Sequence, residues 1–448
     1  METSNEPYCL ETRLIHGGAA PENDNGATIT PIHYSVAFEH DSAESMERIF
    51  QGKDDGFVYT RLRNPTVAAL EARFAAVCNA RGVVAAASGM SAIALALLAL
   101  LKSGDELIAG RFLHGSVYTL FDKSFRELGI TVHFVDPRNP ADAAARFNDR
   151  TRAVFLEALA NPAMVVPDIR EFSRLCRGHG IPLIADATLL TPYAFDAAAL
   201  GVSVTVYSAS KFLAGPATTL GGLIVDNGTY SSRDNPPSGW EHLVRQHGES
   251  AYLVKLTRRM MMDYGPALAP MNAFLLLLGL ETLSLRMERQ NQNAERVAAF
   301  LNRHPAVREV LYPGLPGAPG HELAKAQFGG RFGSLISFTL ASRAACFSFL
   351  NALGLIRRSS NLGDTKSLAI HPASTLYTGY WPAELAAVGV GEEMVRLSVG
   401  LEAETDIISD LEQALATAAR GCGPALTAQT PRDSVAPIKR PAKSREEP

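Results

Sequence analysis

Residues 181–211 read IPLIADATLLTPYAFDAAALGVSVTVYSASK, and this stretch holds the clearest signal for the fold. It contains two short apolar runs typical of buried β-strands, IPLIAD (181–186) and VTVYS (204–208). The first run closes on Asp186, and Lys211 follows shortly after the second. We therefore expect two strands of one sheet with charged side chains near their carboxyl ends.

The alternation of β-rich runs with helical stretches extends from about residue 65 to about residue 265. Strands that alternate with helices predict a mostly parallel sheet with helices on both faces. Seven runs of this kind predict a wide sheet, with strands at 83–87, 106–110, 131–135, 153–157, 181–186, 204–208 and 221–225. We expect helices at 66–77, 91–101, 117–128 and 169–177.

The sequence changes character on either side of this region. Residues 1–64 contain scattered Gly, Pro and Asn, which predicts an irregular arm that reaches toward a partner subunit. We expect the large domain over 65–270, and then a linker helix and a small α/β domain over 271–421. The linker is predicted as one helix over 272–300, and the small domain as strands at 333–340 and 395–400 and helices at 344–353 and 404–419. The tail, 422–448, has little apolar content and is predicted to be disordered.

Composition limits the kinds of partner. The 448 residues are 47% hydrophobic, enough for a large core and two or three domains. A net charge of −4 gives no electrostatic reason to expect a nucleic acid or an anionic membrane. The uncharged run 83–101 is broken near its start by Ser88-Gly-Met-Ser91, so we interpret it as a strand, a turn and a core helix. Five cysteines without a CxxC pair predict neither a disulfide framework nor a metal site, and favour the cytoplasm.

Lys211 is the first candidate for chemistry. Its position just past a buried strand places it at the sheet edge where open α/β folds bind ligands. Removal of the amine from water disfavours the ammonium form and frees the amine to attack an aldehyde. A surface lysine at a strand end is the alternative interpretation.

Asp186 ends an apolar strand, so its carboxylate needs a cationic partner or several hydrogen-bond donors. A protonated pyridine nitrogen is such a partner, and its charge makes a bound ring an electron sink. An aspartate that caps a helix is the alternative.

Two further motifs predict binding of anions. In Ser88-Gly-Met-Ser-Ala92 a strand turns into an Ala- and Leu-rich helix, whose free N–H groups favour a phosphate. Ser208 and Ser210 add hydroxyl donors just before the lysine. Arg396 lies in the strand VRLSVG, and arginine is the usual bidentate partner of a carboxylate such as that of an amino acid. A surface arginine in a salt bridge is the alternative there.

In this order along the chain, the motifs resemble the Cys/Met-metabolism pyridoxal-phosphate (PLP) enzymes. That family includes cystathionine synthases and lyases, methionine γ-lyase and the O-acetylhomoserine sulfhydrylases. The resemblance covers residues 10–420 and rests on Tyr59-Thr-Arg61, Asn64-Pro-Thr66, Ser88-Gly-Met-Ser-Ala92, Asp186-Ala-Thr188, Ser208-Ala-Ser-Lys211 and Val395-Arg-Leu-Ser-Val-Gly400. Residues 269–283 and 361–374 are most similar to the O-acetylhomoserine sulfhydrylase branch.

The resemblance implies a fold and a set of roles. The fold would be type I, like aspartate aminotransferase, with a seven-stranded large domain and a small C-terminal domain. Lys211 would hold PLP as a Schiff base and then act as the base. The other cofactor contacts would come from Asp186 at the ring nitrogen, Thr188 against the ring, Asn161 near the ring hydroxyl, and Gly89, Met90, Ser208 and Ser210 at the phosphate. Asn361 and Arg396 would bind the substrate carboxylate.

The same resemblance implies active sites shared between subunits of a homodimer or homotetramer. Tyr59 and Arg61 would reach the phosphate of the neighbouring subunit, and Tyr59 is also a candidate catalytic residue. The reaction would be replacement of the γ-substituent of an O-acylated homoserine by sulfide or a thiol, as in methionine biosynthesis. The alternatives are elimination or replacement of the methionine γ-lyase or cystathionine γ-lyase and synthase type, an aminotransferase, and a non-catalytic PLP-binding relative.

Three positions depart from the family pattern. His114 stands where a tyrosine usually stacks on the PLP ring, and it keeps the ability to stack and to exchange a proton. Tyr377 stands where a histidine often follows the HPAST segment, and Phe212-Leu-Ala-Gly-Pro216 replaces a more common Gly-His ending. The different pKa of a histidine predicts an altered pH profile, and His114 is therefore a third candidate catalytic residue.

Overall fold

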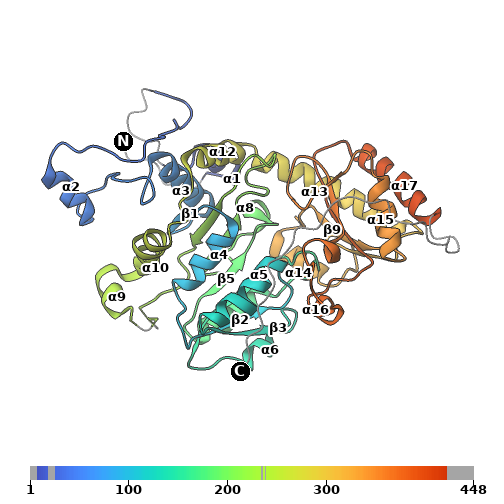
Figure 1. Ribbon diagram of the computed structural model, residues 1–448, viewed down its shortest axis with the longest axis horizontal. Helices are drawn as coiled ribbons and strands as arrows, with labels where there is room; N and C mark the ends of the chain where they lie inside the picture. Colours follow the sequence, from blue (N-terminus) through green and yellow to red (C-terminus); the bar gives the residue numbers. More distant parts are fainter. Residues whose placement is uncertain (1–7, 19–25, 234–235, 238, 421–448) are drawn as a thin grey trace, which may run out of the picture.

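A computed structural model describes residues 8–18, 26–233, 236–237 and 239–420. Two sheet-containing regions lie beside each other along the long axis of the molecule (Figure 1). The predicted tail and Cys422 lie outside the described residues. The fold expected from the sequence is confirmed, whereas the exact domain boundaries stay predictions.

Within the described residues, seven strands form the large sheet in the order β1-β7-β6-β5-β4-β2-β3. The strands β6, β5, β4, β2 and β3 run parallel, and β7 is antiparallel to both of its neighbours. The bounds are β1 (Gly82–Ala86), β2 (Glu106–Gly110), β3 (Thr131–Val135), β4 (Thr151–Glu157), β5 (Leu183–Asp186), β6 (Val204–Ser208) and β7 (Gly222–Asp226). Each predicted run became one of these strands, so the wide, mostly parallel sheet is as expected.

Apolar side chains cover both faces of this sheet, as the continuous apolar runs predict. In β4, Val154 and Leu156 join one hydrophobic cluster, while Ala153 and Phe155 join the cluster on the opposite face. The covering helices include α3 (Pro65–Cys78), α4 (Gly89–Leu98), α7 (Ile169–Gly178) and α12 (Pro270–Glu281). Shorter helical elements complete the region: α5 (Gly115–Thr119), η1 (Leu120–Phe125), α6 (Pro140–Ala144), α8 (Thr191–Ala194), α9 (Glu241–His247), η2 (Gly248–Ser250), α10 (Ala251–Lys255), η3 (Leu256–Met261) and α11 (Met262–Tyr264).

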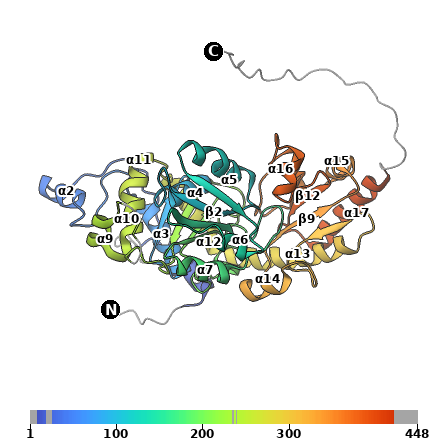
Figure 2. The same cartoon turned by 90° about the horizontal axis from the view of Figure 1, so that it is seen from below.

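The small region contains a second sheet, which in the described chain has five strands in the order β10-β11-β12-β9-β8. Its strands are β8 (Glu309–Leu311), β9 (Leu335–Thr339), β10 (Arg357–Arg358), β11 (Leu368–Ile370) and β12 (Met394–Ser398). Its helices are α13 (Leu283–Arg303), α14 (His321–Phe328), α15 (Arg343–Ala352), η4 (Pro372–Ser374), α16 (Pro382–Ala387) and α17 (Glu404–Arg420). Figure 2 shows α13 running below this sheet, with α15 and α17 nearby.

Two predictions of local structure were wrong. The single helix expected over 272–300 is two helices, α12 and α13, because Thr282 leaves the helical conformation with φ −109° and ψ 7°. The guanidinium of Arg286 donates to the carbonyls of Gly279 and Phe212, over 2.6 Å each, and so binds a carbonyl near the end of α12. This tertiary contact has no local signature in the sequence.

The arm expected to be irregular contains two helices, α1 (Leu10–His16) and α2 (Ala43–Phe50). Ser42 caps α2 by accepting a hydrogen bond from the backbone N–H of Ser45. The side chains of α2 are all at least partly exposed, and the helix projects from the end of the molecule opposite the small sheet (Figures 1 and 2). Helix α2 thus has a local cap but no buried side chain, whereas α1 buries Leu14 in the core.

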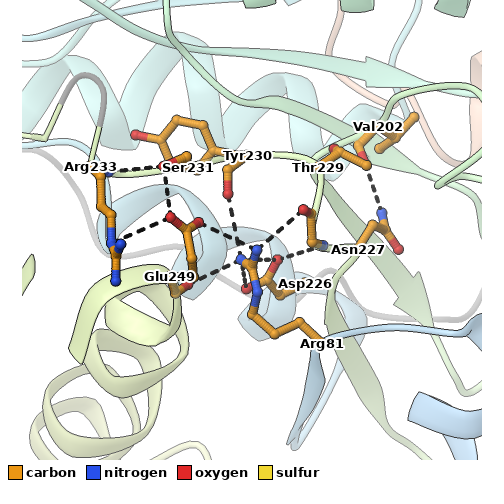
Figure 3. A network of polar contacts seen from close by, with 10 residues as sticks. Arg81, Val202, Asp226, Asn227, Thr229, Tyr230, Ser231, Arg233 and Glu249 are labelled. Atoms are coloured by element: carbon orange, nitrogen blue, oxygen red, sulfur yellow. Dashed lines mark hydrogen bonds and ion pairs between the residues drawn. The ribbon is translucent and has the colours of Figure 1, made fainter.

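At one edge of the large sheet, a polar network joins β1 and β7 to the segment before α10 (Figure 3). Arg81 pairs with Asp226 at 3.1 Å and donates to the carbonyl of Glu249 at 3.0 Å. The carboxylate of Glu249 in turn accepts from the hydroxyl of Ser231 at 2.9 Å. Asp226 pairs with Val204, the first residue of β6, whereas Asp186 is the last residue of the parallel strand β5. The network therefore lies at the end of the strands opposite to the end that carries Asp186.

No helix among the described residues is sufficiently long and apolar to cross a membrane.

Candidate active site

A cavity of about 240 Å³ lies where β4, β5 and β6 end. These parallel strands finish on Glu157, Asp186 and Ser208, and Glu157 stands opposite Asp186 in the strand register. Ten residues predicted for the site line this cavity together: Gly89, Met90, His114, Asn161, Asp186, Thr188, Ser208, Ser210, Lys211 and Arg396. An eleventh, Asn361, accepts a hydrogen bond from Lys211. The parallel topology therefore brings together residues that are spread over more than 270 positions of the chain.

Lys211 sits in the turn that follows β6, where its backbone N–H donates to the carbonyl of Ser208. Its Nζ donates to Oδ1 of Asn361 over 2.7 Å. Burial, and then the positive charge of Arg396, lower the pKa of this amine. A larger share of the amine is therefore free to act as a nucleophile or a base than in an exposed lysine.

Asp186 and Thr188 are held together by local hydrogen bonds. Oδ1 of Asp186 accepts from the backbone N–H of Thr188 at 2.9 Å, and Oγ1 of Thr188 accepts from the N–H of Ser208 at 2.8 Å. Burial raises the pKa of Asp186. A cationic group that docked against this carboxylate would stabilise its charged form, and a protonated ring nitrogen meets that need.

The N-terminus of α4 opens onto the same cavity. Ser88 and Ser91 form a reciprocal capping box, with Oγ of each accepting the backbone N–H of the other. A Cβ on Gly89 would lie 2.6 Å from Cβ of Ser208, so only glycine lets the helix start approach β6 this closely. A helix N-terminus beside serine hydroxyls suits a phosphate.

The two serines differ in their contacts. The hydroxyl of Ser210 accepts from the N–H of Gly221 at 2.9 Å and donates to the carbonyl of the same glycine at 3.2 Å. Its hydrogen-bonding capacity toward a phosphate is therefore partly used within the chain. Ser208 lines the cavity beside Gly89, which makes it the better placed phosphate ligand of the two.

Arg396 is 2% exposed and supplies the positive charge on the far side of the cavity. Its Nη1 donates to Oδ1 of Asn161 at 3.2 Å, and its Nη2 donates to the carbonyls of Ser360 and Asn361. Its buried Nε has no hydrogen-bond partner in the part of the chain that the structure describes. Burial lowers the pKa of Arg396 to about 10. A buried guanidinium with an unused N–H fits a carboxylate ligand.

His114 caps the short helix α5, and its Nδ1 accepts from the N–H of Ser116 at 3.4 Å. Burial lowers its pKa to about 4, with smaller contributions from the positive charges of Arg396 and Lys211. The imidazole is therefore neutral at neutral pH. An acceptor role for Nδ1 places the proton on Nε2.

Tyr59 and Arg61 are not brought to Lys211 within one chain. Tyr59 is 40% exposed, and Arg61 lies over its ring at 5.5 Å while donating to the carbonyl of Met262. Arg61 instead lines a separate cavity of about 560 Å³ between the arm and α3. Neither residue lines the Lys211 cavity of its own chain.

The structure adds residues that the motifs did not predict. Glu157 accepts the backbone N–H groups of His114 and Asn161, and burial together with the nearby Asp186 charge raises its pKa to about 8. Its position at the end of the run AVFLE was the available signal, because it parallels that of Asp186 in IPLIAD. Tyr377 also reaches the site, from the small region, and nothing local in the sequence predicts that contact.

The residues present fit PLP. They combine an amine of lowered pKa, a buried carboxylate in need of a cation, a helix N-terminus opened by Gly89 and a guanidinium with an unused N–H. These would meet the aldehyde, the ring nitrogen and the phosphate of PLP, and the carboxylate of an amino-acid substrate.

Comparison with known proteins agrees with this fit. Residues 11–416 match the family described as Cys/Met metabolism PLP-dependent enzyme. An O-acetyl-L-homoserine sulfhydrylase of Leptospira meyeri is 37% identical over 424 residues, covering 90% of this chain and 96% of that protein. An L-methionine gamma-lyase of Porphyromonas gingivalis is also 37% identical, over 406 residues, covering 90% of this chain and 96% of that protein. The crystal structure of a putative O-acetylhomoserine (thiol)-lyase of Campylobacter jejuni, which carries N'-pyridoxyl-lysine-5'-monophosphate, superposes with a TM-score of 0.85 at 32% identity and covers 91% of this chain and 100% of that one.

Proposed function

Because the chain belongs to the Cys/Met metabolism PLP-dependent enzymes, we propose that it catalyses γ-replacement on an O-acylated homoserine. Sulfide or a thiol is the incoming group, and homocysteine or a related thioether amino acid is the product. Similarity to sulfhydrylases over nine-tenths of the chain supports this reaction. The observation that carries the proposal is that the Lys211 amine and the Arg396 guanidinium, with its unused N–H, line one cavity.

PLP, when bound, supplies an electron sink for the charge that is left when the Cα proton is removed. Asp186 is the residue that keeps a proton on the ring nitrogen, because its buried carboxylate is stabilised by that positive charge. The N–H groups of Gly89 and Met90, with the hydroxyl of Ser208, would bind the phosphate. Together these residues would hold the cofactor where β5 and β6 end.

Arg396 and Asn361 orient the substrate. The guanidinium binds the substrate carboxylate through its unused Nε–H, while Asn161 and the carbonyls of Ser360 and Asn361 hold its other nitrogens. Lys211 then takes the proton from Cα, since its lowered pKa leaves part of the amine unprotonated. Loss of a second proton, from Cβ, would allow the acyloxy group to leave Cγ as a carboxylate, with formation of a Cβ–Cγ double bond. Sulfide or a thiol would then add at Cγ, and protons would return to Cβ and Cα to give the product.

A γ-lyase is the second candidate, because the methionine γ-lyase relative is as similar as the sulfhydrylase. In that reaction water completes the sequence, and the products are a 2-oxo acid and ammonia. The deciding experiment is product analysis with O-acetyl-L-homoserine, with and without sulfide. Homocysteine that forms only with sulfide supports the sulfhydrylase. Formation of 2-oxobutyrate regardless of sulfide would contradict it and support the lyase, and absence of turnover with PLP bound would favour a different substrate or a non-catalytic relative.

We also propose a homodimer, alone or paired into a tetramer, in which Tyr59 and Arg61 bind the phosphate of the neighbouring subunit. Support comes from the position of both residues outside the Lys211 cavity of their own chain. Large apolar side chains that are exposed in the arm and in α11 support it too: Tyr34, Phe50 and Tyr264. A cytoplasmic location remains a prediction from the cysteine usage.

A further inference from the structure

Tyr377 belongs to the small region and contacts the backbone of the large region beside the site. It follows the short helix η4 and is 1% exposed. Its hydroxyl lies 2.9 Å from the carbonyl oxygen of Leu113 and 3.2 Å from that of Asn161. One O–H proton is thus shared between two backbone carbonyls that belong to different loops of the large region.

Glu157 contacts the same two loops from the end of β4. Its Oε1 accepts the backbone N–H of His114 at 2.6 Å, and its Oε2 accepts the backbone N–H of Asn161 at 3.0 Å. The Leu113 carbonyl and the His114 N–H are the two ends of a single peptide unit. Tyr377 and Glu157 therefore hold that peptide from both sides. They also bind the N–H and the carbonyl of Asn161, which belong to two successive peptide units.

Both of these backbones carry a side chain of the site. His114 lines the cavity, and the positive charges of Arg396 and Lys211 help to lower its pKa. Asn161 accepts from Nη1 of Arg396 through Oδ1. The position of the imidazole, and one of the bonds that orients the guanidinium, thus depend on the same pair of residues.

We infer that Tyr377 and Glu157 form a positioning pair that sets the His114 ring against the cofactor and orients Arg396 through Asn161. The two positions at which this chain departs most visibly from the family pattern, His114 and Tyr377, therefore meet at one peptide. This inference rests on the proposed PLP-dependent function. It assigns Tyr377 to the coupling of the small region to the cofactor site, without contact with the substrate.

The test uses the hydroxyl of Tyr377 and a matched hydroxyl nearby. Tyr380 lies in the same loop, and its hydroxyl contacts the carbonyl of Gly115 at 3.2 Å and the hydroxyl of Thr119. Tyr380→Phe thus removes a similar contact to α5 without touching the Leu113 peptide. We expect Tyr377→Phe to lower kcat/KM by on the order of tenfold, since it leaves two buried carbonyls without their donor, and Tyr380→Phe to change it less than about twofold.

The second readout does not depend on the substrate. The visible circular dichroism and the dissociation constant of bound PLP report how the protein holds the ring. We expect both to change in Tyr377→Phe and to stay at wild-type values in Tyr380→Phe. In a His114→Phe background, Tyr377→Phe should lose most of its effect on the dichroism, because coupled residues give non-additive changes. Equal behaviour of the two tyrosine variants, or full additivity with His114→Phe, would overturn the inference.

If Tyr377→Phe does not fold, Glu157→Gln replaces it in the test. Glutamine has one oxygen and one nitrogen at these positions, and its nitrogen cannot accept a backbone N–H, so one of the two contacts to His114 and Asn161 is lost. It should alter the dichroism and kcat/KM in the same direction, and wild-type values in that variant would refute the pair. The outcome is separable from that of the proposed function. If the wild type lacks sulfhydrylase activity but Tyr377→Phe changes the PLP dichroism, only the proposed function is refuted. If the wild type is active and Tyr377→Phe leaves the dichroism and kcat/KM unchanged, only the inference is refuted.

Discussion

Nζ of Lys211 donates to Oδ1 of Asn361 over 2.7 Å, so the lysine that follows β6 is bound directly to an asparagine of the small region. The contact connects the two candidate roles, since Lys211 is proposed to hold the cofactor and Asn361 to bind the substrate. The partner of the amine is a neutral amide oxygen, which leaves the charge of the lysine uncompensated. Burial and Arg396 can therefore lower its pKa.

Asn361→Asp should oppose the lowering of the Lys211 pKa. A carboxylate in contact with the amine favours the ammonium form and raises the pKa of Lys211. Because the free amine is the form that reacts with the aldehyde of PLP, reconstitution of the apo-protein should shift to higher pH. The measurement is the rate of PLP uptake across a pH series, with Asn361→Ala as the uncharged control. A profile in the aspartate variant that coincides with that of the alanine variant would refute the charge argument.

Lys211→Ala should abolish turnover while the protein stays folded. The amine is proposed both to hold PLP and to move the Cα proton, and loss of a general base alone costs about 10²- to 10⁴-fold in rate. Steady-state turnover and thermal unfolding are measured together. Lys325→Ala, at an exposed position on α14, serves as the control for loss of a lysine. Retained activity in the Lys211 variant would rule out the mechanism.

Arg396→Lys should raise KM far more than it lowers kcat. Lysine keeps the positive charge but loses the planar fork of donors, and so cannot satisfy Asn161, Asn361 and a substrate carboxylate together. We expect kcat/KM to fall by about thirtyfold or more, equivalent to one charge-assisted hydrogen bond. Arg358→Lys is the matched control, at an exposed arginine that binds the carbonyl of Leu350. Similar kinetics for the two variants would argue against a carboxylate site at Arg396.

Mixing of two inactive proteins tests the shared site. In a hybrid dimer of Arg61→Ala with Lys211→Ala, one site combines the intact Lys211 of one subunit with the intact Arg61 of the other. Random reassociation should therefore restore about a quarter of wild-type activity, because half of the dimers are hybrids with one working site of two. Each variant alone, taken through the same unfolding and reassociation, is the control. A mixture as inactive as its components would place both residues in one subunit's site or in none.

The seven strands of the large sheet could be predicted because each is an apolar run that is buried on both faces, as Val154 and Phe155 of β4 illustrate. Lys211 and Asp186 were predictable for the same reason, since they mark where such runs end. The break at Thr282 was not, because it depends on the contacts that Arg286 makes with Gly279 and Phe212. Local periodicity carries no information about a carbonyl that is bound from another part of the chain.

The same limit applies to the site. Glu157 and Tyr377 act on backbone groups of His114 and Asn161, and backbone groups leave no trace in residue identity. Tyr377 is more than 200 positions away from both of its acceptors. Only the three-dimensional arrangement could reveal that they contact one peptide from opposite sides.

His114 gives a prediction for pH and stability. Its pKa of about 4 in the folded chain lies below the ordinary value of 6.5, first because it is buried and then because Arg396 and Lys211 face it with positive charge; Glu157 accepts its backbone N–H. The unfolded chain therefore binds more protons than the folded chain between these two values, and stability falls as the pH falls. The stability that His114 contributes is fully present above pH 6.5 and is lost as the pH approaches 4.

His114→Phe should remove up to about one proton from the slope of unfolding free energy against pH in that window. Urea unfolding of wild type and variant apo-protein from pH 4 to pH 8 measures this slope, and the two curves should run parallel above pH 6.5. Curves that stay parallel down to pH 4 would mean that His114 takes up its proton as readily in the folded chain as in the unfolded chain, and that burial does not lower its pKa.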